Sequence, residues 1–219
     1  MSVPIYHYGV VDKPEATLSA GGIKDIDMEN LDYKRQIDPA RLARALRAKG
    51  GIVCGMWRGG MFGLATNQVA VLSAWAGSQS PAERFAAALG GDDAAVVDQG
   101  EYAATVRPDA PEPITQGGFY VIRWIRMRRA DVAEYTQLCL ETWLAFEASA
   151  ACRCYGVFQP LGKGDVQKLL MLTWYGSLND WDVSRGLAPG DKAKWARRSE
   201  MELSHWADAG RLIDPEDIA

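Results

Sequence analysis

One stretch of the chain occurs twice, and this duplication constrains the fold more than any other feature. Residues 67–78 read Asn-Gln-Val-Ala-Val-Leu-Ser-Ala-Trp-Ala-Gly-Ser, and residues 167–177 read Gln-Lys-Leu-Leu-Met-Leu-Thr-Trp-Tyr-Gly-Ser. In both copies an apolar run of strand character ends in Trp-x-Gly-Ser and continues into a short helical pattern. A strand-like piece with a cysteine (Cys54 or Cys154) and an amphipathic helix precede each copy. A long period found twice indicates two copies of one supersecondary unit.

The second half of the chain shows the element pattern of one unit. Alternating β-forming residues predict a strand at 119–127, and apolar residues at three- and four-residue steps predict an amphipathic helix after it. Asp131 and Glu134 have the spacing of a capping box at the start of this helix. The other predicted elements are strands at 152–158 and 168–175, a short helix at 178–185 capped by Ser177 or Asn179, and a last helix from about 191 to 209 that ends at Gly210.

The first half repeats this order less clearly. Asp38 as N-cap and Pro39 at the first helical position predict a helix at 39–49. For the first strand there are two candidates, the polar segment 23–33 and the alternative segment 5–11. The remaining predicted elements are strands at 52–57, 69–75 and 102–106 and a helix at 81–89.

The proline-rich segment 108–118 separates the two halves and is predicted to be a linker between a first repeat, 1–107, and a second repeat, 119–219. The order strand, helix, strand, strand, helix, strand is that of a ferredoxin-like unit, whose antiparallel sheet has helices on one face only. Two such sheets can cover each other's bare faces by closing into a barrel. We therefore predict an α+β fold of two tandem ferredoxin-like repeats that form an α+β barrel with the helices outside.

Composition excludes several classes of function. The formal net charge of −4 argues against a nucleic-acid partner, which needs a basic face. The N-terminus lacks the pattern of a secretory signal, and no apolar run has the roughly 20 residues that span a bilayer, so a cytoplasmic protein without a membrane partner is expected. Four cysteines and two histidines without a recognised spacing predict buried structural thiols and no metal site.

With these elements in place, the chain resembles the dimeric α+β barrel superfamily, close to its NIPSNAP and antibiotic-biosynthesis-monooxygenase branches, over about residues 39–107 and 119–208. The resemblance rests on the segments 69–78 and 170–181, because the last barrel strand of the family typically ends in Trp, a small residue, Ser and an amphipathic helix, and on Trp195-Ala-Arg-Arg-Ser-Glu200. It implies a homodimer and activities that include cofactor-independent monooxygenases, haem-degrading enzymes, cyclases and decarboxylases. The helix after the Trp strand lacks the histidine of haem-binding members, so no cofactor is expected.

The two repeated tryptophans are predicted to face the inside of the barrel, since side chains alternate between the two faces of a strand. The cavity would then be apolar, with one amide at its mouth, which suits a flat aromatic ligand. The tryptophans would either stack on that ligand or plug the barrel. The residues that share this register are Asn67, Val69, Val71, Ser73 and Trp75 in the first repeat and Leu170, Leu172 and Trp174 in the second.

On the strand at 119–127, one face carries Tyr120, Ile122, Trp124 and Arg126 and is predicted to face the cavity. Arg126 would bind a carboxylate or phenolate there, or else pair with a surface acid. The opposite, more apolar face is predicted to lie under helices. Arg123 is the one charged residue on that face, and we keep it as a candidate ligand contact.

The N-terminal Tyr6-His7-Tyr8 offers a second group of candidates. His7 would be a general base folded over the barrel mouth, or a surface or interface histidine. Tyr8 would contact the same ligand, as would Trp57, which ends a strand at a flexible Gly-Gly turn. His205, beside Trp206 on the predicted last helix, is expected to be exposed.

Several functions remain open. The preferred hypothesis is a cofactor-independent enzyme acting on an aromatic small molecule in the barrel, most simply a lyase of the decarboxylase or deformylase type, with Arg126 as anion anchor and Tyr120 or His7 as proton donor. A cofactor-free monooxygenase is the first alternative, and a non-catalytic ligand-binding or structural barrel is the second. The chain contains no Walker loop, dinucleotide fingerprint or nucleophile elbow.

Overall fold

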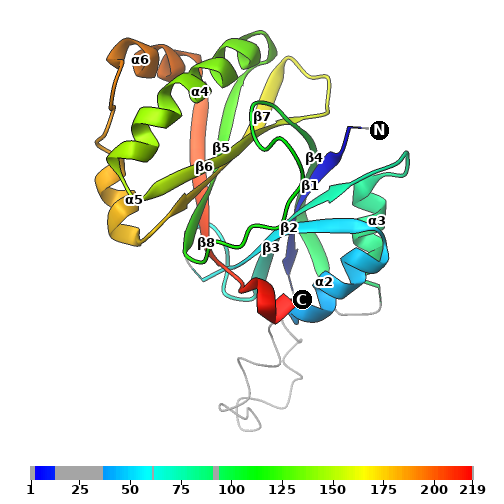
Figure 1. Ribbon diagram of the computed structural model, residues 1–219. Coiled ribbons are helices and arrows are strands. Elements are labelled where there is room, and N and C mark those ends of the chain that lie inside the picture. The colour runs from blue at the N-terminus through cyan, green and yellow to red at the C-terminus, as the bar shows by residue number, and fades with distance from the viewer. Residues whose placement is uncertain (1–2, 13–36, 61, 91–93, 219) are drawn as a thin grey trace, which may run out of the picture.

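A computed structural model describes residues 3–12, 37–60, 62–90 and 94–218. Within them, eight strands form one closed antiparallel barrel in the order β1-β3-β2-β8-β5-β7-β6-β4, and all the α-helices lie outside it (Figure 1). The strands are β1 (Ile5–Asp12), β2 (Gly51–Arg58), β3 (Gln68–Trp75), β4 (Ala95–Ala104), β5 (Phe119–Arg128), β6 (Cys152–Pro160), β7 (Val166–Tyr175) and β8 (Ser204–Leu212). The helices are α2 (Pro39–Ala48), α3 (Pro81–Ala88), α4 (Val132–Ser149), α5 (Leu178–Ser184) and α6 (Lys192–Met201), with short 3-10 turns η2 (Arg129–Asp131) and η3 (Pro215–Ile218).

The predicted duplication is confirmed by the pairing of the strands. The first repeat has the strand order β4-β1-β3-β2, and the second has the equivalent order β8-β5-β7-β6. Each repeat has a register shift at the same place, between Val53 and Gly55 in β2 and between Cys154 and Gly156 in β6. The repeats join through the pairs β2–β8 and β4–β6. The predicted α+β barrel of two repeats is therefore closed within one chain.

Most predicted helix starts are confirmed, but the capping box of α4 is wrong. Ser177 caps α5, accepting a hydrogen bond from the backbone N–H of Asp180 at 3.1 Å. At α4, the 3-10 turn η2 leads into the helix instead, and the Asp131 side chain makes no capping hydrogen bond. The Glu134 carboxylate, the other half of the predicted capping box, instead accepts a 2.6 Å hydrogen bond from Arg197 Nε on α6.

The predicted last helix is wrong in its second half. Helix α6 ends at Met201, and Ser204 starts β8, which pairs with β5 along its length and with β2 at its end. The alanines and polar residues of this segment fit a helix locally, but the open edge of β5 supplies a full ladder of hydrogen bonds, and tertiary pairing overrides such a weak propensity. His205 and Trp206 consequently lie on a strand.

The opening strand of the first repeat is the alternative candidate, because β1 spans Ile5–Asp12 and pairs with both β3 and β4. The other candidate, 23–33, lies outside the described residues. Strand β4 begins at Ala95 rather than at residue 102, and residues 105–118 then lead to β5 without a helix or strand.

The two repeated tryptophans do not face the same side of the barrel. Trp174 lies opposite Tyr120 and faces inward, but Trp75 lies opposite Ile5 and packs with Phe85 under the helices. The structural equivalent of Trp75 is Tyr175, which lies opposite Phe119. The repeat is thus offset by one residue between sequence and structure. Since β3 is buried on both faces, it has no alternation that could have set its register.

The prediction of the inner face is therefore correct for Leu170, Leu172 and Trp174 and wrong for the first repeat. Strand β3 turns its small or aliphatic residues inward, namely Ala70, Leu72 and Ala74. Three residues that were predicted to line the cavity lie in the outer core instead, namely Val69, Val71 and Trp75. The buried Ser73 lies on the same face of the strand.

The middle of the barrel is filled by aromatic side chains. Tyr8 meets Trp124 edge to face with ring centroids 5.0 Å apart, and Tyr6 lies 5.0 Å from Phe158. Such ring pairs add about 0.5–1.5 kcal/mol each beyond their buried area. Side chains therefore fill the middle of the bore, and a cavity lies towards one end of the barrel. None of the described helices is long and apolar enough to cross a membrane.

Candidate functional site

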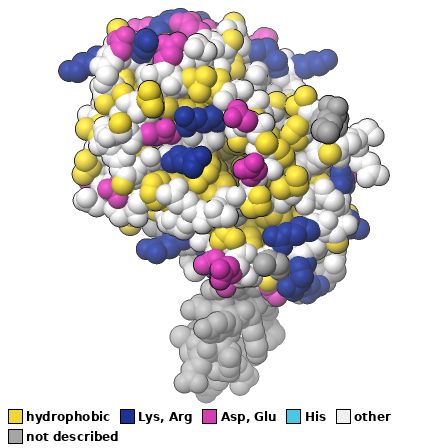
Figure 2. Space-filling model, viewed as in Figure 1, with side chains coloured by type: hydrophobic (Ala, Val, Ile, Leu, Met, Phe, Trp, Pro, Cys, Tyr) yellow, Lys and Arg dark blue, Asp and Glu magenta, His cyan; other side chains and the backbone are white. Residues whose placement is uncertain are grey.

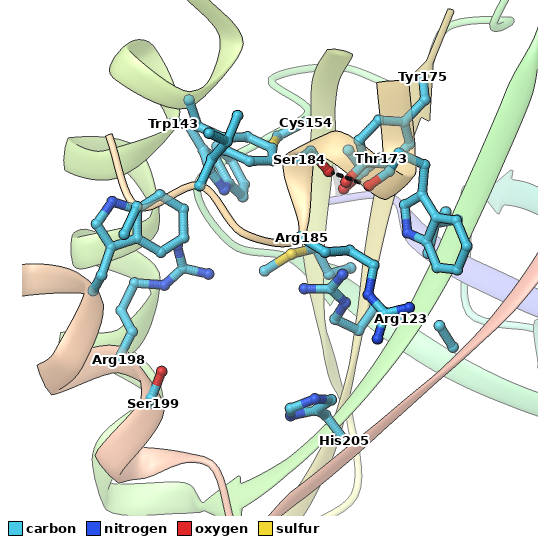
Figure 3. Close-up of a pocket in the computed structure, with 18 of the residues that line it drawn as sticks. Arg123, Trp143, Cys154, Thr173, Tyr175, Ser184, Arg185, Arg198, Ser199 and His205 are labelled. Atoms are coloured by element: carbon cyan, nitrogen blue, oxygen red, sulfur yellow. Dashed lines mark hydrogen bonds between the residues drawn. The ribbon is translucent and has the colours of Figure 1, made fainter. Parts of the chain in front are cut away.

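A cleft of about 790 Å³ lies between the outer face of the second repeat's sheet and the helices that cover it (Figure 3). This size is typical of small-molecule sites. Strands β5 and β7 form the floor, and α4, α5 and α6 form the walls. The main lining residues are Arg123, Met171, Thr173 and Tyr175 on the floor and Trp143, Trp181, Ser184, Arg185, Trp195 and Arg198 on the walls.

The cleft concentrates positive charge in an acidic protein. Five basic side chains line it, and no described carboxylate does; the five are Arg123, Arg185, Lys192, Arg198 and His205. In Figure 3, Arg123 and Arg185 point into the middle of the cavity. Among the described residues, neither guanidinium has a hydrogen-bonding or ion-pair partner, although Arg185 stacks 5.2 Å from the Trp181 ring. Both are available to an anionic ligand.

Arg198 is the most unusual of these groups because its side chain is 6% exposed and has only neutral hydrogen-bonding partners. It donates to the hydroxyls of Thr142 at 2.9 Å and Tyr135 at 3.3 Å, and it stacks 4.7 Å from the Trp195 ring. Its Nε has no partner in the described structure. The Glu202 carboxylate acts on this charge only from behind the Tyr135 hydroxyl, and an anion in the cleft would offset more of the cost of burying it.

His205 stands at the open side of the cleft, below Arg123 in the view of Figure 3. Its Nδ1 lies 2.8 Å from Glu202 Oε2, so the carboxylate fixes the imidazole and leaves Nε2 as the free nitrogen. Glu202 also accepts a 3.0 Å hydrogen bond from the Tyr135 hydroxyl. An imidazole held in this way by a carboxylate can act as a general acid or base.

On the floor, the Tyr175 hydroxyl is hydrogen-bonded to Ser184 of α5. Burial raises the pKa of Tyr175, against the opposing effect of the nearby Arg123 charge. Tyr175 therefore offers a neutral hydroxyl to a ligand, in contrast with the charged groups around it.

The three residues predicted to be catalytic lie apart from this cleft and from one another. Arg126 is on the bore face of β5, as predicted, but is exposed beyond the packed interior. Tyr120 is fully buried in the bore, where its hydroxyl donates to the Gln116 carbonyl oxygen, and burial raises its pKa.

The placement of His7 at the barrel mouth is wrong. Its side chain faces outward from β1 and is buried under α3, with its ring 4.5 Å from Phe85 and Nε2 3.1 Å from Gln99 Oε1. Both flanking tyrosines, Tyr6 and Tyr8, point into the bore, so strand alternation sends His7 to the other side.

Of the predicted ligand contacts, only Arg123 lines the cleft. Trp174 lies at the end of the bore, and Trp75 is in the outer core, where its Nε1 donates to Ser73 Oγ at 2.9 Å. The Asn67 amide donates to the Asp12 carboxylate. The predicted contacts that are packed into the middle of the bore are Trp57, Tyr8 and Trp124.

The sequence argument missed Arg185, Arg198 and His205. A usable signal existed in the pairs Trp181–Arg185 and Trp195–Arg198, because residues three or four apart on a helix share a face. Each pair puts a guanidinium beside an indole, and both pairs belong to helices that cover the same sheet.

Neither a family model nor a curated protein sequence matches this chain. Solved structures do match it over nearly its whole length. A chlorite dismutase variant from Candidatus Nitrospira defluvii is 12% identical, with 98% of this chain and 92% of that chain covered and a TM-score of 0.59. The chain has an α+β barrel fold.

Two further α+β barrels are similar to this chain. An anthrone oxidase-like protein is 10% identical, with coverage of 97% of this chain and 92% of that chain and a TM-score of 0.57. A heme-binding protein from Thermus thermophilus is 10% identical, with coverage of 100% and 94% and a TM-score of 0.55. At such identities the likeness establishes the fold, and the site must be judged on its own residues.

The cleft of this α+β barrel does not fit a haem. Haem iron is held by His, Cys thiolate, Tyr, or Met together with His. The imidazole at the cleft is that of His205, which is 60% exposed at the mouth and paired with Glu202. Burial raises the pKa of Cys154 and of Tyr175, which disfavours the thiolate and the phenolate. We therefore derive no chemistry through haem.

Proposed function

We propose that this α+β barrel is an enzyme that works without an organic cofactor on a small aromatic acid held in the cleft of the second repeat. The observation that carries the proposal is the set of three guanidiniums, Arg123, Arg185 and Arg198, that face one cavity without a described carboxylate. Indole rings flank two of them. A flat anion is the ligand that satisfies both features at once.

The positions of the guanidiniums support one orientation of the ligand. Arg123 and Arg185, in the middle of the cavity, can bind a carboxylate with paired N–H groups, which a single lysine could not do. The ring of the ligand would then lie against Trp181 and Trp195. Arg198, on the opposite wall, would face a second electron-rich group, such as a phenolic oxygen.

A lyase reaction fits this arrangement. In a decarboxylation the bond between the ring carbon and the carboxylate breaks, carbon dioxide leaves, and the electron pair stays on the ring. Arg198 would stabilise the charge that spreads onto the phenolic oxygen, since such electrostatic stabilisation acts on charge that develops in the transition state. His205 would then donate a proton to the ring carbon and recover it from solvent. Glu202 would act as a positioning residue for the imidazole.

A cofactor-free monooxygenase is the alternative within the same site. One similar structure is that of an anthrone oxidase-like protein. In that reaction His205 would instead remove a proton from a phenol, molecular oxygen would add to a carbon of the electron-rich ring, and loss of water would leave a quinone, so that the substrate itself supplies the electrons. A ligand-binding protein without turnover is the remaining alternative.

The test is to incubate the protein with hydroxybenzoic and hydroxynaphthoic acids and to follow binding, carbon dioxide release and oxygen uptake together. Carbon dioxide release supports the lyase, oxygen uptake supports the monooxygenase, and binding alone supports a binding protein. Arg123→Gln should weaken binding by at least about tenfold, as expected for the loss of a charge-assisted hydrogen bond. The matched control is Arg128→Gln, an exposed arginine on the same strand outside the cleft. Equal affinity in both variants would contradict the proposal.

A further inference from the structure

A second cavity, of about 880 Å³, lies at one end of the barrel, between the bore and the segment that connects β4 to β5. Figure 2 shows a hollow among hydrophobic side chains, with acidic and basic side chains around it. The bore residues that line the cavity are Tyr6, Cys54, Leu72, Phe158, Leu172 and Trp174. The bore residues of this cavity lie on the other face of the sheet from the cleft described above, and Cys154 of β6 lines both.

The connecting segment forms a fixed wall of this cavity. Ile114 is 8% exposed, packs with the bore residues and donates its backbone N–H to the Cys54 carbonyl at 2.7 Å. The Tyr155 hydroxyl contacts Gln116 Oε1 at 3.4 Å, and Trp174 Nε1 donates to the Gly117 carbonyl at 3.0 Å. The segment is thus held at three successive points, and the cavity is part of the fold.

The inner end of the cavity carries a polar group that the protein leaves unused. The Tyr6 side chain is 2% exposed and lines the cavity, and its hydroxyl has no hydrogen-bonding partner among the described residues. This hydroxyl is not one of the fully buried polar atoms without a partner, so it is open to the cavity, where a ligand can form a hydrogen bond with it. The ring of Phe158, 5.0 Å from Tyr6, supplies an apolar surface beside it.

The inner end is also uncharged. Burial raises the pKa of Tyr6 to about 12 and that of Cys54 to about 12, so both groups keep their protons at neutral pH. The charges stand at the outer edge, where Arg107 pairs with Glu147 at 2.7 Å and Arg153 lies 5.0 Å from the Tyr155 ring. Asp109 and Glu112 add negative charge at this edge. The cavity therefore differs from the cationic cleft and has no anchor for an anion at depth.

We propose that this end of the barrel is a binding site for an uncharged aromatic molecule with a hydroxyl group, which forms a hydrogen bond with the Tyr6 hydroxyl. The ring of the ligand packs between Phe158 and Trp174. The two sites lie back to back across β7, because Leu172 and Trp174 face this cavity while Thr173 and Tyr175 face the cleft. The inference does not depend on the function proposed for the cleft.

The experiment compares 2-naphthol, which is neutral at pH 7, with 2-naphthoate, which is an anion of the same shape. Calorimetric titration of the whole protein should show binding of 2-naphthol that persists when 2-naphthoate saturates the cleft. Tyr6→Phe should weaken 2-naphthol by about fivefold, the effect of one neutral hydrogen bond, and leave 2-naphthoate unchanged. Arg123→Gln should weaken the binding of 2-naphthoate and leave the affinity for 2-naphthol unchanged.

Tyr6→Phe is suited to this test because it removes a hydroxyl that holds nothing in place, so the variant should fold with an unchanged melting temperature. A second variant, Leu72→Phe, fills the cavity and should abolish 2-naphthol binding. The proposal is overturned if 2-naphthol does not bind, if it competes with 2-naphthoate for one site, or if Tyr6→Phe leaves its affinity unchanged. Failure of 2-naphthoate to bind would count only against the function proposed for the cleft.

Discussion

At the scale of single residues, a substitution of Arg198 can distinguish a role in ligand binding from a role in stability. Its guanidinium is buried and forms no ion pair with a described carboxylate. Its two hydroxyl partners have other acceptors, since Thr142 donates to the Leu138 carbonyl and Tyr135 donates to Glu202. Removing the charge therefore leaves neither hydroxyl without an acceptor.

We predict that Arg198→Met changes the free energy of unfolding by less than about 1 kcal/mol, because an apolar side chain replaces a costly buried charge. The same variant should lower the affinity for an aromatic acid at least about tenfold. Urea unfolding and calorimetric titration measure the two quantities. The control is Arg197→Met on the same helix, which removes an exposed ion pair with Glu134 and should leave affinity unchanged. A large loss of stability in Arg198→Met would show that the guanidinium is structural.

His7 gives a prediction on pH. Burial lowers its pKa in the folded state, against smaller opposing effects of Gln99 and Glu101. The unfolded chain, with an ordinary histidine near pH 6.5, binds the proton more readily than the folded protein. The stability contributed by neutral His7 is therefore complete above pH 6.5 and is lost as the pH falls below it, by at most about 1.4 kcal/mol per pH unit.

Urea unfolding of the natural protein and of His7→Gln between pH 5 and 7.5 tests this prediction. Glutamine does not titrate, so the difference in unfolding free energy between the two proteins should shrink as the pH falls. Parallel curves would contradict it.

At the scale of elements, the sequence was sufficient where one unit could be compared with another. Strand β5 and helix α4 have clear periodicities of their own, and the repeat located β3 and β7. Strand β8 could not be predicted in the same way, because its stability comes from pairing with β5, which no local pattern records. The prediction of which β3 side chains point inward failed for a related reason. A strand that is buried on both faces shows no alternation of apolar and polar residues.

The assignment of β8 as a strand can be tested with proline. Ala207 lies opposite Arg123, in the middle of the pairing between β8 and β5. Ala207→Pro should lower the free energy of unfolding by about 3 kcal/mol or more, because proline cannot take part in an interior ladder. Lys192→Pro, at the first position of α6, should cost little, since proline suits the start of a helix. Urea unfolding compares the variants, and equal losses would argue against the pairing.

At the scale of the whole molecule, the candidate site was predicted less well than the fold. The duplication in the sequence implies a barrel. The cleft depends in addition on how α5 and α6 lie over the sheet, and the sequences of the loops that position these helices are not repeated in the first half of the chain. The expected homodimer remains a prediction: closure of the barrel leaves no unpaired sheet edge among the described strands, so these strands of two chains would meet through the outer surface. Sedimentation velocity tests it, and a species of monomer mass at micromolar concentration would contradict it.

The two seams between the repeats give the last prediction. In β5–β7 the pairing runs from Phe119 to Arg128, whereas the β2–β8 seam pairs only Trp57 with Leu212 and Arg58 with Arg211. The β4–β6 seam is also short, from Tyr102 to Ala104. Local opening costs least where few hydrogen bonds and contacts must break. Amides at both seams should therefore exchange with deuterium faster than those of β5 and β7, as followed by mass spectrometry of peptic peptides. Equal protection across the barrel would show that the repeats open only together.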